Sequence, residues 1–265
     1  MLNISEYSKD NVAEEVDYTG SKSYILDSDV YNITVKQCYG IKQPSGSMCL
    51  RFTLETSDGR TVKSDQYFLS KKGTIYYKKK AGTNQHIPGF SRCAGIMACA
   101  FPEEYKEFIK DIDNGETLTK RHESFFQGFL NSMKPGQVTE YNYDTKEDEI
   151  IDVDNVLTLI VGKTFKAAIA KNMVSKKEKD ATGTYIATSA TRDENEVVLE
   201  FSNAGLSSVE MRGGIVEPVA MPNWIKNKRG EIFDNRDKDF KGTAVPSPGQ
   251  QQEQTTQTGT IFDNM

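Results

Sequence analysis

The chain of 265 residues has little of the side-chain chemistry on which most enzymes depend. It has only two histidines, His86 and His122, so histidine-based acid–base catalysis has little material. It contains no complete motif of a phosphate-binding loop, a zinc hydrolase, a zinc deaminase or a serine hydrolase. The run from Val161 to Thr164 is similar to the end of a phosphate-binding loop but lacks the first glycine. We therefore expect a protein that is not an enzyme and that binds no cofactor.

Cysteine and long apolar runs are also scarce. The four cysteines include no C-x-x-C pair, which argues against a zinc ribbon and against a redox motif. Cys38, Cys49, Cys93 and His86 could in principle meet around a metal ion, but nothing in their spacing favours it, and we expect no metal. No run of about eighteen apolar residues occurs, and the N-terminus lacks the basic-then-apolar order of a secretory signal. We expect a soluble, cytoplasmic protein with reduced thiols and no membrane partner.

What the chain does have is a strong asymmetry of charge. Residues 36 to 92 hold eleven Lys or Arg against three acids, a net charge of +8, in a chain whose formal charge is −5. Seven aromatic residues run through this basic segment. Because cations follow a phosphate backbone and aromatic rings stack on unpaired bases, the segment predicts binding of single-stranded nucleic acid. The alternative is a solvated basic surface over ordinary core aromatics.

Alternating apolar and polar residues predict three strands between residues 30 and 69. The Asp58-Gly59 pair favours a tight hairpin before the third of them. In that strand Val62 and Phe68 fall on one face and Lys63 and Tyr67 on the other. Residues 70 to 82 then predict a lysine-rich hairpin or loop. The outer face of this meander would present Lys36, Arg51, Lys63 and Tyr67.

Helices are expected next, over residues 93–101, 103–112 and 120–133, the first of them capped by Ser91. Residues 140 to 154 hold seven acids and one lysine, which predicts an exposed acidic loop.

Two-fold alternation returns over residues 156 to 174, which predicts one long strand bent at Gly162. A turn over residues 176–183, a strand over 184–190, a second turn over 193–195 and a last strand over 197–201 follow. We therefore expect five or six strands, with the helices inserted after the third.

The C-terminal part has a different composition. Residues 241 to 260 are rich in Pro, Gln, Thr and Gly, with too few apolar residues to offset the entropy of ordering, so we expect a disordered tail. The next four residues, Ile261-Phe262-Asp263-Asn264, repeat Ile232-Phe233-Asp234-Asn235. An apolar and acidic tip on a tether is typical of a partner-binding peptide, with Ile261, Phe262 and Asp263 as its contacts. Coincidence is the alternative explanation of the repeat.

Three meandering strands, a helix and a final hairpin are the order of the OB-fold, whose second and third strands bind oligonucleotides. Over roughly residues 28 to 210 the chain resembles the single-stranded DNA-binding proteins encoded by tailed bacteriophages. The resemblance rests on these segments: Val30–Lys36, Ser45–Phe52, Asp58-Gly59, Lys71–Gly73, Tyr76-Tyr77 and His86–Phe90.

This resemblance implies non-sequence-specific binding of single-stranded DNA during phage replication or recombination, in the cytoplasm of the host. It also implies a homodimer or cooperative homo-oligomer, whose tail binds other replication or recombination proteins. Many tails of that family are strongly acidic, whereas residues 241–265 hold only Glu253 and Asp263 against Lys241. That difference puts autoinhibition by the tail in doubt.

The expected fold is therefore mainly β with inserted helices: an OB-fold-like five-stranded Greek-key barrel with a helical insertion and a disordered C-terminal tail. Its parts would be an N-terminal arm (1–27), the DNA-binding domain (28–225, with a helical and acidic insertion at about 91–154) and the tail (226–265). The candidate DNA-binding residues are Lys36, Arg51, Lys63, Tyr67, Lys71, Lys72, Tyr76, Tyr77, Lys78, Lys79, Lys80 and Arg92.

Two other functions remain open. One is a non-enzymatic phage adaptor whose lysines only keep it soluble. The other is a metal-dependent nuclease that uses Glu147, Asp148, Glu149 and Asp152, although contiguous acids in a polar run are more typical of a solvated loop.

Overall fold

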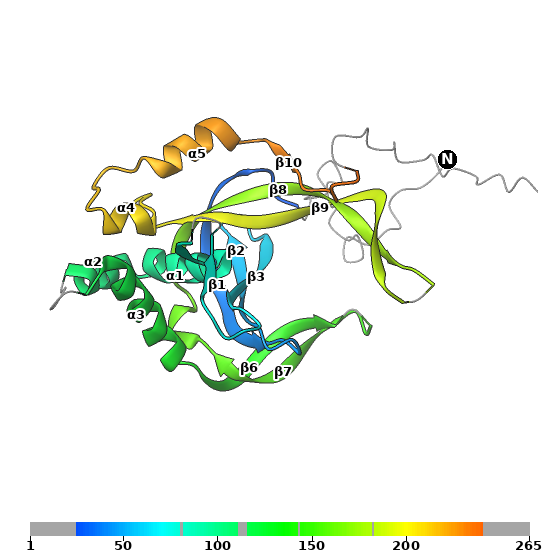
Figure 1. Ribbon diagram of the computed structural model, residues 1–265, viewed down its shortest axis with the longest axis horizontal. Coiled ribbons are helices and arrows are strands. Elements are labelled where there is room, and N and C mark those ends of the chain that lie inside the picture. The colour runs from blue at the N-terminus through cyan, green and yellow to red at the C-terminus, as the bar shows by residue number, and fades with distance from the viewer. Residues whose placement is uncertain (1–24, 80–81, 111–115, 143, 182, 241–265) are drawn as a thin grey trace, which may run out of the picture.

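Figure 1 shows the computed structural model of the chain, in which residues 25–79, 82–110, 116–142, 144–181 and 183–240 are described. The described part is mainly β-structure, with most of its helices gathered at one end. Its strands are β1 (Asp29–Lys42), β2 (Met48–Thr56), β3 (Thr61–Leu69), β4 (Tyr76–Lys78), β5 (Asn84–His86), β6 (Lys134–Asn142), β7 (Glu147–Val156), β8 (Thr164–Lys179), β9 (Tyr185–Phe201) and β10 (Ile232–Asp234). Its helices are α1 (Pro88–Ala100), α2 (Pro102–Lys110), α3 (Leu118–Asn131), α4 (Ser208–Arg212) and α5 (Ala220–Lys228), with a 3₁₀ turn η4 (Thr158–Ile160).

Eight of these strands form one sheet. β2 pairs with β1 and with β3 as an antiparallel meander, and β8 lies between β1 and β9. β4 and β5 form a separate hairpin. Within the described residues no ladder of hydrogen bonds joins β3 to β9, so the sheet is open there. The prediction of a mainly β protein with inserted helices is confirmed, whereas a closed barrel is not.

The meander follows the alternation in the sequence. In β3, Val62 and Phe68 are buried and Lys63 and Tyr67 are exposed, as predicted. Gly59 has a φ of 81° in the hairpin turn that precedes β3, a conformation that favours glycine. The lysine-rich segment forms the hairpin β4–β5, in agreement with the prediction for residues 70–82.

Helix α1 is buried from Cys93 to its end and packs against β3 and β9. It begins at Pro88, with Ile87 as its N-cap, so the predicted cap at Ser91 is wrong. Proline is favoured at the first helical position because its φ is already helical and it has no N–H to leave unpaired. The apolar and small residues of α1 meet the sheet, which places the core between the helices and the meander.

Glycine is required at position 89, because α1 approaches the backbone of β3 there. A Cβ at Gly89 would lie 2.1 Å from the carbonyl oxygen of Tyr67. We expect Gly89→Ala to lower the free energy of unfolding by about 2 kcal/mol, because backbone must shift to make room. Urea denaturation measures this. Gly128→Ala in α3 is the control: nothing lies within 4 Å of a Cβ there, and alanine should stabilise the helix by up to about 1 kcal/mol. Equal effects would contradict the close approach.

The long strand β9 has no turn at residues 193–195, so that prediction is wrong. Asn195 instead uses its side chain to bind the main chain of Leu26, accepting from its N–H and donating to its C=O, each at 2.8 Å. Continuous pairing with β8 keeps the segment extended. The Asp-Glu-Asn run is a turn signal by composition, and tertiary pairing overrides it.

The predicted bent strand over residues 156–174 is also wrong. β7 ends at Val156, η4 follows, and β8 begins only at Thr164. Gly162, with a φ of 80°, makes the break between them rather than a bend within one strand. Both segments still pair with the same strand, β1.

The C-terminal part is ordered further than predicted. Helix α5 extends to Lys228, and β10 pairs in parallel with residues 171–173 of β8. The first copy of the repeated tetrapeptide is thus an edge strand of the main sheet, and the tail boundary predicted at residue 226 is too early. The predicted contacts Ile261, Phe262 and Asp263 lie outside the described residues.

Of the two histidines, His122 is a core residue. Its Nδ1 lies 2.8 Å from the hydroxyl of Tyr105, and burial lowers the pKa of His122 to about 3. The imidazole is therefore neutral at pH 7. None of the helices in the described ranges is long and apolar enough to cross a membrane.

Candidate nucleic-acid interface

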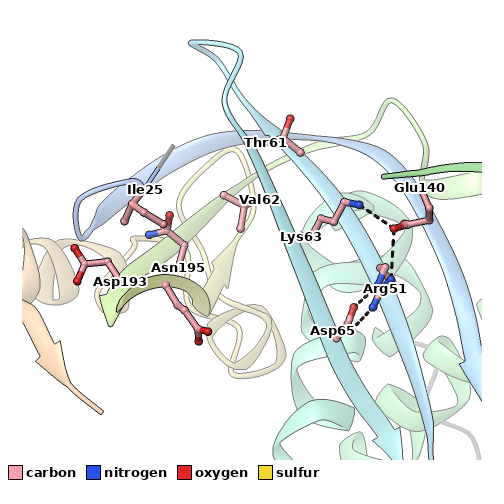
Figure 2. Close-up of a pocket in the computed structure, with 10 residues that line it drawn as sticks. Ile25, Arg51, Thr61, Val62, Lys63, Asp65, Glu140, Asp193 and Asn195 are labelled. Atoms are coloured by element: carbon pink, nitrogen blue, oxygen red, sulfur yellow. Dashed lines mark hydrogen bonds and ion pairs between the residues drawn. The ribbon is translucent and has the colours of Figure 1, made fainter. Parts of the chain in front are cut away.

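A groove of about 530 Å³ lies on the outer face of β2 and β3 (Figure 2). Arg51 and Lys63 project into it from the meander, Glu140 enters from β6, and Asp193 and Glu194 come from β9. Two predicted DNA contacts, Arg51 and Lys63, are thus brought together. In Figure 1 the β6–β7 and β8–β9 hairpins extend on either side of the meander.

The cations of this groove already have acidic partners. Arg51 donates two hydrogen bonds of 2.7 Å to Asp65, and its third nitrogen lies 3.5 Å from Glu140. Lys63 donates to the same Glu140 carboxylate at 2.8 Å. The Glu140 carboxylate therefore lies between two cations and partly neutralises both. Lys36 is paired in the same way, with Glu55 at 3.3 Å.

Two opposing effects determine the pKa of Glu140. Burial alone would raise it, but hydrogen bonds from Lys63 and Tyr39 hold the pKa of Glu140 below its usual value. The carboxylate is consequently ionised at neutral pH. With Asp65, Asp193 and Glu194 beside it, the lining of the groove has more acids than cations.

Exposed lysines without acidic partners lie next to the groove-forming meander, in the turn after β3 and in the β4–β5 hairpin. Lys71, Lys72, Lys78 and Lys79 are exposed and form no ion pair within the described residues. Lys80 lies outside the described residues. Four predicted contacts are therefore free to bind an anion.

The three predicted stacking tyrosines are exposed, in two different settings. Tyr67 is 47% exposed on β3, and Tyr77, 42% exposed, donates a hydrogen bond to Gln85. Tyr76 is stacked on His86 with 4.9 Å between ring centroids, and His86 is stacked on Phe90 at 4.5 Å. Tyr76 thus ends an aromatic ladder that is rooted in the core.

Glu123 holds this ladder in place. Its carboxylate accepts hydrogen bonds from the Tyr76 hydroxyl and from His86 Nε2, the latter at 2.8 Å. Burial, together with the hydrogen bond to Glu123, raises the pKa of Tyr76 to about 12. The phenol is therefore a neutral, fixed ring at the end of the hairpin.

Arg92 is placed apart from the other predicted contacts. It lies in α1, and its guanidinium is 3.5 Å from the buried carboxylate of Glu200. Its side chain is only 19% exposed, which favours a structural role in the core over contact with phosphate.

Sequence reasoning missed the far end of the β8–β9 hairpin. Lys176, Lys177 and Lys179 are exposed there, and the Lys179 ammonium lies 5.3 Å from the ring centroid of exposed Tyr185. The turn predicted over residues 176–183 is wrong for its first part, because residues 176–179 belong to β8 and pair with β9. The combination of these lysines with Tyr185 in the next strand was the available signal.

The acidic segment is a hairpin rather than a loop. Glu147, Asp148, Glu149 and Asp152 lie in β7, paired with β6, and are exposed. Within the described residues no group of three or more His, Cys, Asp or Glu side chains is placed to hold a metal ion. Cys38, Cys49 and Cys93 are buried, while His86 belongs to the aromatic ladder.

No protein-family model matches the chain, and no curated protein matches it either.

Proposed function

We propose that the chain binds single-stranded DNA without sequence specificity and protects it during replication or recombination. One observation carries the proposal: between residues 67 and 79, three exposed tyrosines are interspersed with four exposed lysines that have no carboxylate partner among the described residues. Lysines that can neutralise phosphates and rings that can stack on bases are the two components of single-strand recognition. Neither component distinguishes one base sequence from another.

The arrangement of the strands supports the proposal. β1, β2, β3, β8 and β9 occur in the order of the five strands of an OB-fold, with α1 after the third. The groove lies on the β2–β3 face, where OB-folds bind oligonucleotides. We infer an OB-like fold that is open between β3 and β9. The single-stranded DNA would contact the lysines of the β4–β5 hairpin first. It would then continue into the groove that contains Glu140.

The decisive experiment is a salt titration of the full chain with oligo-dT and with duplex DNA of equal length, with and without magnesium. We expect tight binding of oligo-dT that weakens as salt rises, and much weaker binding of duplex. Binding of neither DNA would support the adaptor hypothesis, and degradation in magnesium would support the nuclease hypothesis. Either outcome would overturn the proposal.

Tyr67 provides a test of stacking. We expect Tyr67→Ala to weaken oligo-dT binding by about 1 to 3 kcal/mol without changing the salt dependence, because stacking releases no counterions. Fluorescence anisotropy at several salt concentrations measures both quantities. Tyr141→Ala, a similarly exposed tyrosine on the acidic hairpin, is the matched control. A loss of thermal stability with unchanged affinity would show instead that Tyr67 only packs against the sheet.

Glu140 provides a test of the groove. Glu140→Gln keeps the shape of the side chain but removes its negative charge. That charge neutralises Lys63 and also partly neutralises Arg51. One cation made available to phosphate is worth about 0.7 in the slope of log affinity against log salt, so affinity at 0.1 M salt should rise about fivefold. Glu149→Gln, in the exposed strand β7, is the control. Unchanged affinity would place the DNA outside this groove.

A further inference from the structure

The groove on the meander lies where the described part of the chain begins. Ile25, the first described residue, lines the groove together with Val62 of β3 and Asn195 of β9 (Figure 2). Leu26, the next residue, is completely buried, and two hydrogen bonds of 2.8 Å join its main chain to the Asn195 side chain. Residues 1–24, which we call the N-terminal segment, therefore start at the wall of this groove.

The N-terminal segment has two parts that differ in charge. Residues 18–24, next to the groove, hold Lys22 and no acid. Residues 1–17 hold one lysine, Lys9, against five acids, which are Glu6, Asp10, Glu14, Glu15 and Asp17. The C-terminal residues 241–265 hold only two acids against one lysine. Of these two segments, the N-terminal one is therefore the more acidic.

The part next to the groove matches the lining of the groove. That lining holds two cations and four acids, namely Arg51, Lys63, Asp65, Glu140, Asp193 and Glu194. Because acids are in excess there, the groove accommodates a segment with a cation and no acid better than an acidic segment. Residues 18–24 have this composition, with Lys22 as their only charged side chain.

The length of β3 determines where the acids of the segment can arrive. Beyond Val62, β3 continues for seven residues to Leu69, which corresponds to about 24 Å of strand. The eight residues from Tyr24 back to Asp17 extend at most about 28 Å. A segment that leaves Ile25 and follows the outer face of β3 therefore brings Asp17 to the far end of this strand.

Exposed lysines begin at that same end. Lys71 and Lys72 lie in the turn that follows β3, and they have no ion-pair partner among the described residues. Glu14, Glu15 and Asp17 would reach them with the opposite charge. Ion pairs at exposed sites are weak, so a phosphate backbone with many charges can displace them.

We propose that residues 14–24 lie along this groove of their own chain, with their three acids on Lys71 and Lys72, and that single-stranded DNA displaces them on binding. The displacement rests on the proposed function, whereas the docking does not. Attachment at the wall of the groove favours the same chain over a second copy, because so short a tether gives an effective concentration on the order of millimolar. The N-terminal segment thus regulates access to the DNA-binding lysines.

Docking is tested on the full chain without DNA. A carbodiimide joins a carboxylate to a lysine only when the two groups are in contact. We expect cross-links from the three acids to Lys71 or Lys72, identified by mass spectrometry. In an equal mixture of unlabelled and isotope-labelled protein, each cross-link should join two peptides with the same label. Absence of these cross-links, or cross-links between peptides with different labels, would overturn docking within one chain.

Competition with DNA is tested by removing the three negative charges. Glu14→Gln, Glu15→Gln and Asp17→Asn together should raise the affinity for oligo-dT by about tenfold, because DNA no longer has to displace two exposed ion pairs. The control changes the net charge equally on the exposed surface of α2, with Glu103→Gln, Glu104→Gln and Glu107→Gln. Equal gains from the two triple variants would show an effect of net charge alone and would overturn the competition.

A double-mutant cycle tests whether Lys71 and Lys72 are the partners. In a chain that carries Lys71→Gln and Lys72→Gln, the three substitutions in the N-terminal segment should leave affinity unchanged, because the partners of the acids are gone. An undiminished gain would place the acids on other cations and contradict the proposal. If the unmodified protein binds no oligo-dT, the proposed function fails, and the cross-links still decide the docking. Cross-links without a gain in affinity would overturn the regulation.

Discussion

Replacing Lys72, Lys78 and Lys79 together by glutamate should abolish most of the binding of single-stranded DNA. The three side chains are exposed and have no ion-pair partner among the described residues, so all of their charge is available to phosphate. Losing three phosphate contacts should lower the slope of log affinity against log salt by about 2, which is about a hundredfold loss of affinity at 0.1 M salt. Fluorescence anisotropy with oligo-dT across a salt series measures both quantities.

The matched control makes the same change of charge elsewhere. Lys120, Lys226 and Lys238 are exposed residues outside the β3–β5 region, and their replacement by glutamate alters the net charge equally. If the two triple variants lose affinity to the same degree, the effect belongs to the net charge of the molecule, and the basic hairpin is not the binding site.

The local part of the fold could be predicted from the sequence because its determinants are local. The alternation of Val62, Lys63, Tyr67 and Phe68 depends only on the two-residue period of a strand, and the inward and outward faces of β3 follow it. The exposed hairpin β4–β5 is likewise determined by its local sequence. Its lysines and tyrosines are the part of the candidate interface that sequence reasoning found.

The pairing of the charges could not be predicted, because it depends on contacts between distant residues. Lys63 and Glu140 are 77 positions apart and meet only because β6 passes beside the meander. Asn195 and Leu26 are 169 positions apart, and their hydrogen bonds keep a composition typical of turns in an extended strand. Counting cations in residues 36–92 therefore overstated the positive charge of the β2–β3 face.

The burial of Glu200 also depends on contacts with residues that are distant in the sequence. Its sequence context in β9 is unremarkable, yet its carboxylate is buried against α1, where a Cβ at Gly95 would lie 1.8 Å from Oε1. Arg92 is its ion-pair partner at 3.5 Å, and Glu200 Oε2 and Arg92 Nε have no hydrogen-bond partner within the described residues. Burial raises the pKa of Glu200 to about 7, although Arg92 acts in the opposite direction.

Stability should therefore fall as pH rises from about 4.5 to about 7. The folded protein holds the Glu200 proton more tightly than the unfolded chain, whose carboxyl has the ordinary value of 4.5. The stabilising contribution is complete below pH 4.5 and is lost as pH passes through about 7; a shift of this size is worth about 3 kcal/mol.

Glu200→Gln cannot ionise, so its free energy of unfolding, measured by urea denaturation at pH 5 and pH 8, should lack this loss. Glu196→Gln, an exposed carboxylate on the same strand, should keep the pH dependence of the unmodified protein. Parallel pH profiles for the unmodified protein and Glu200→Gln would show that Glu200 does not titrate in this range and that its pairing with Arg92 keeps it ionised throughout.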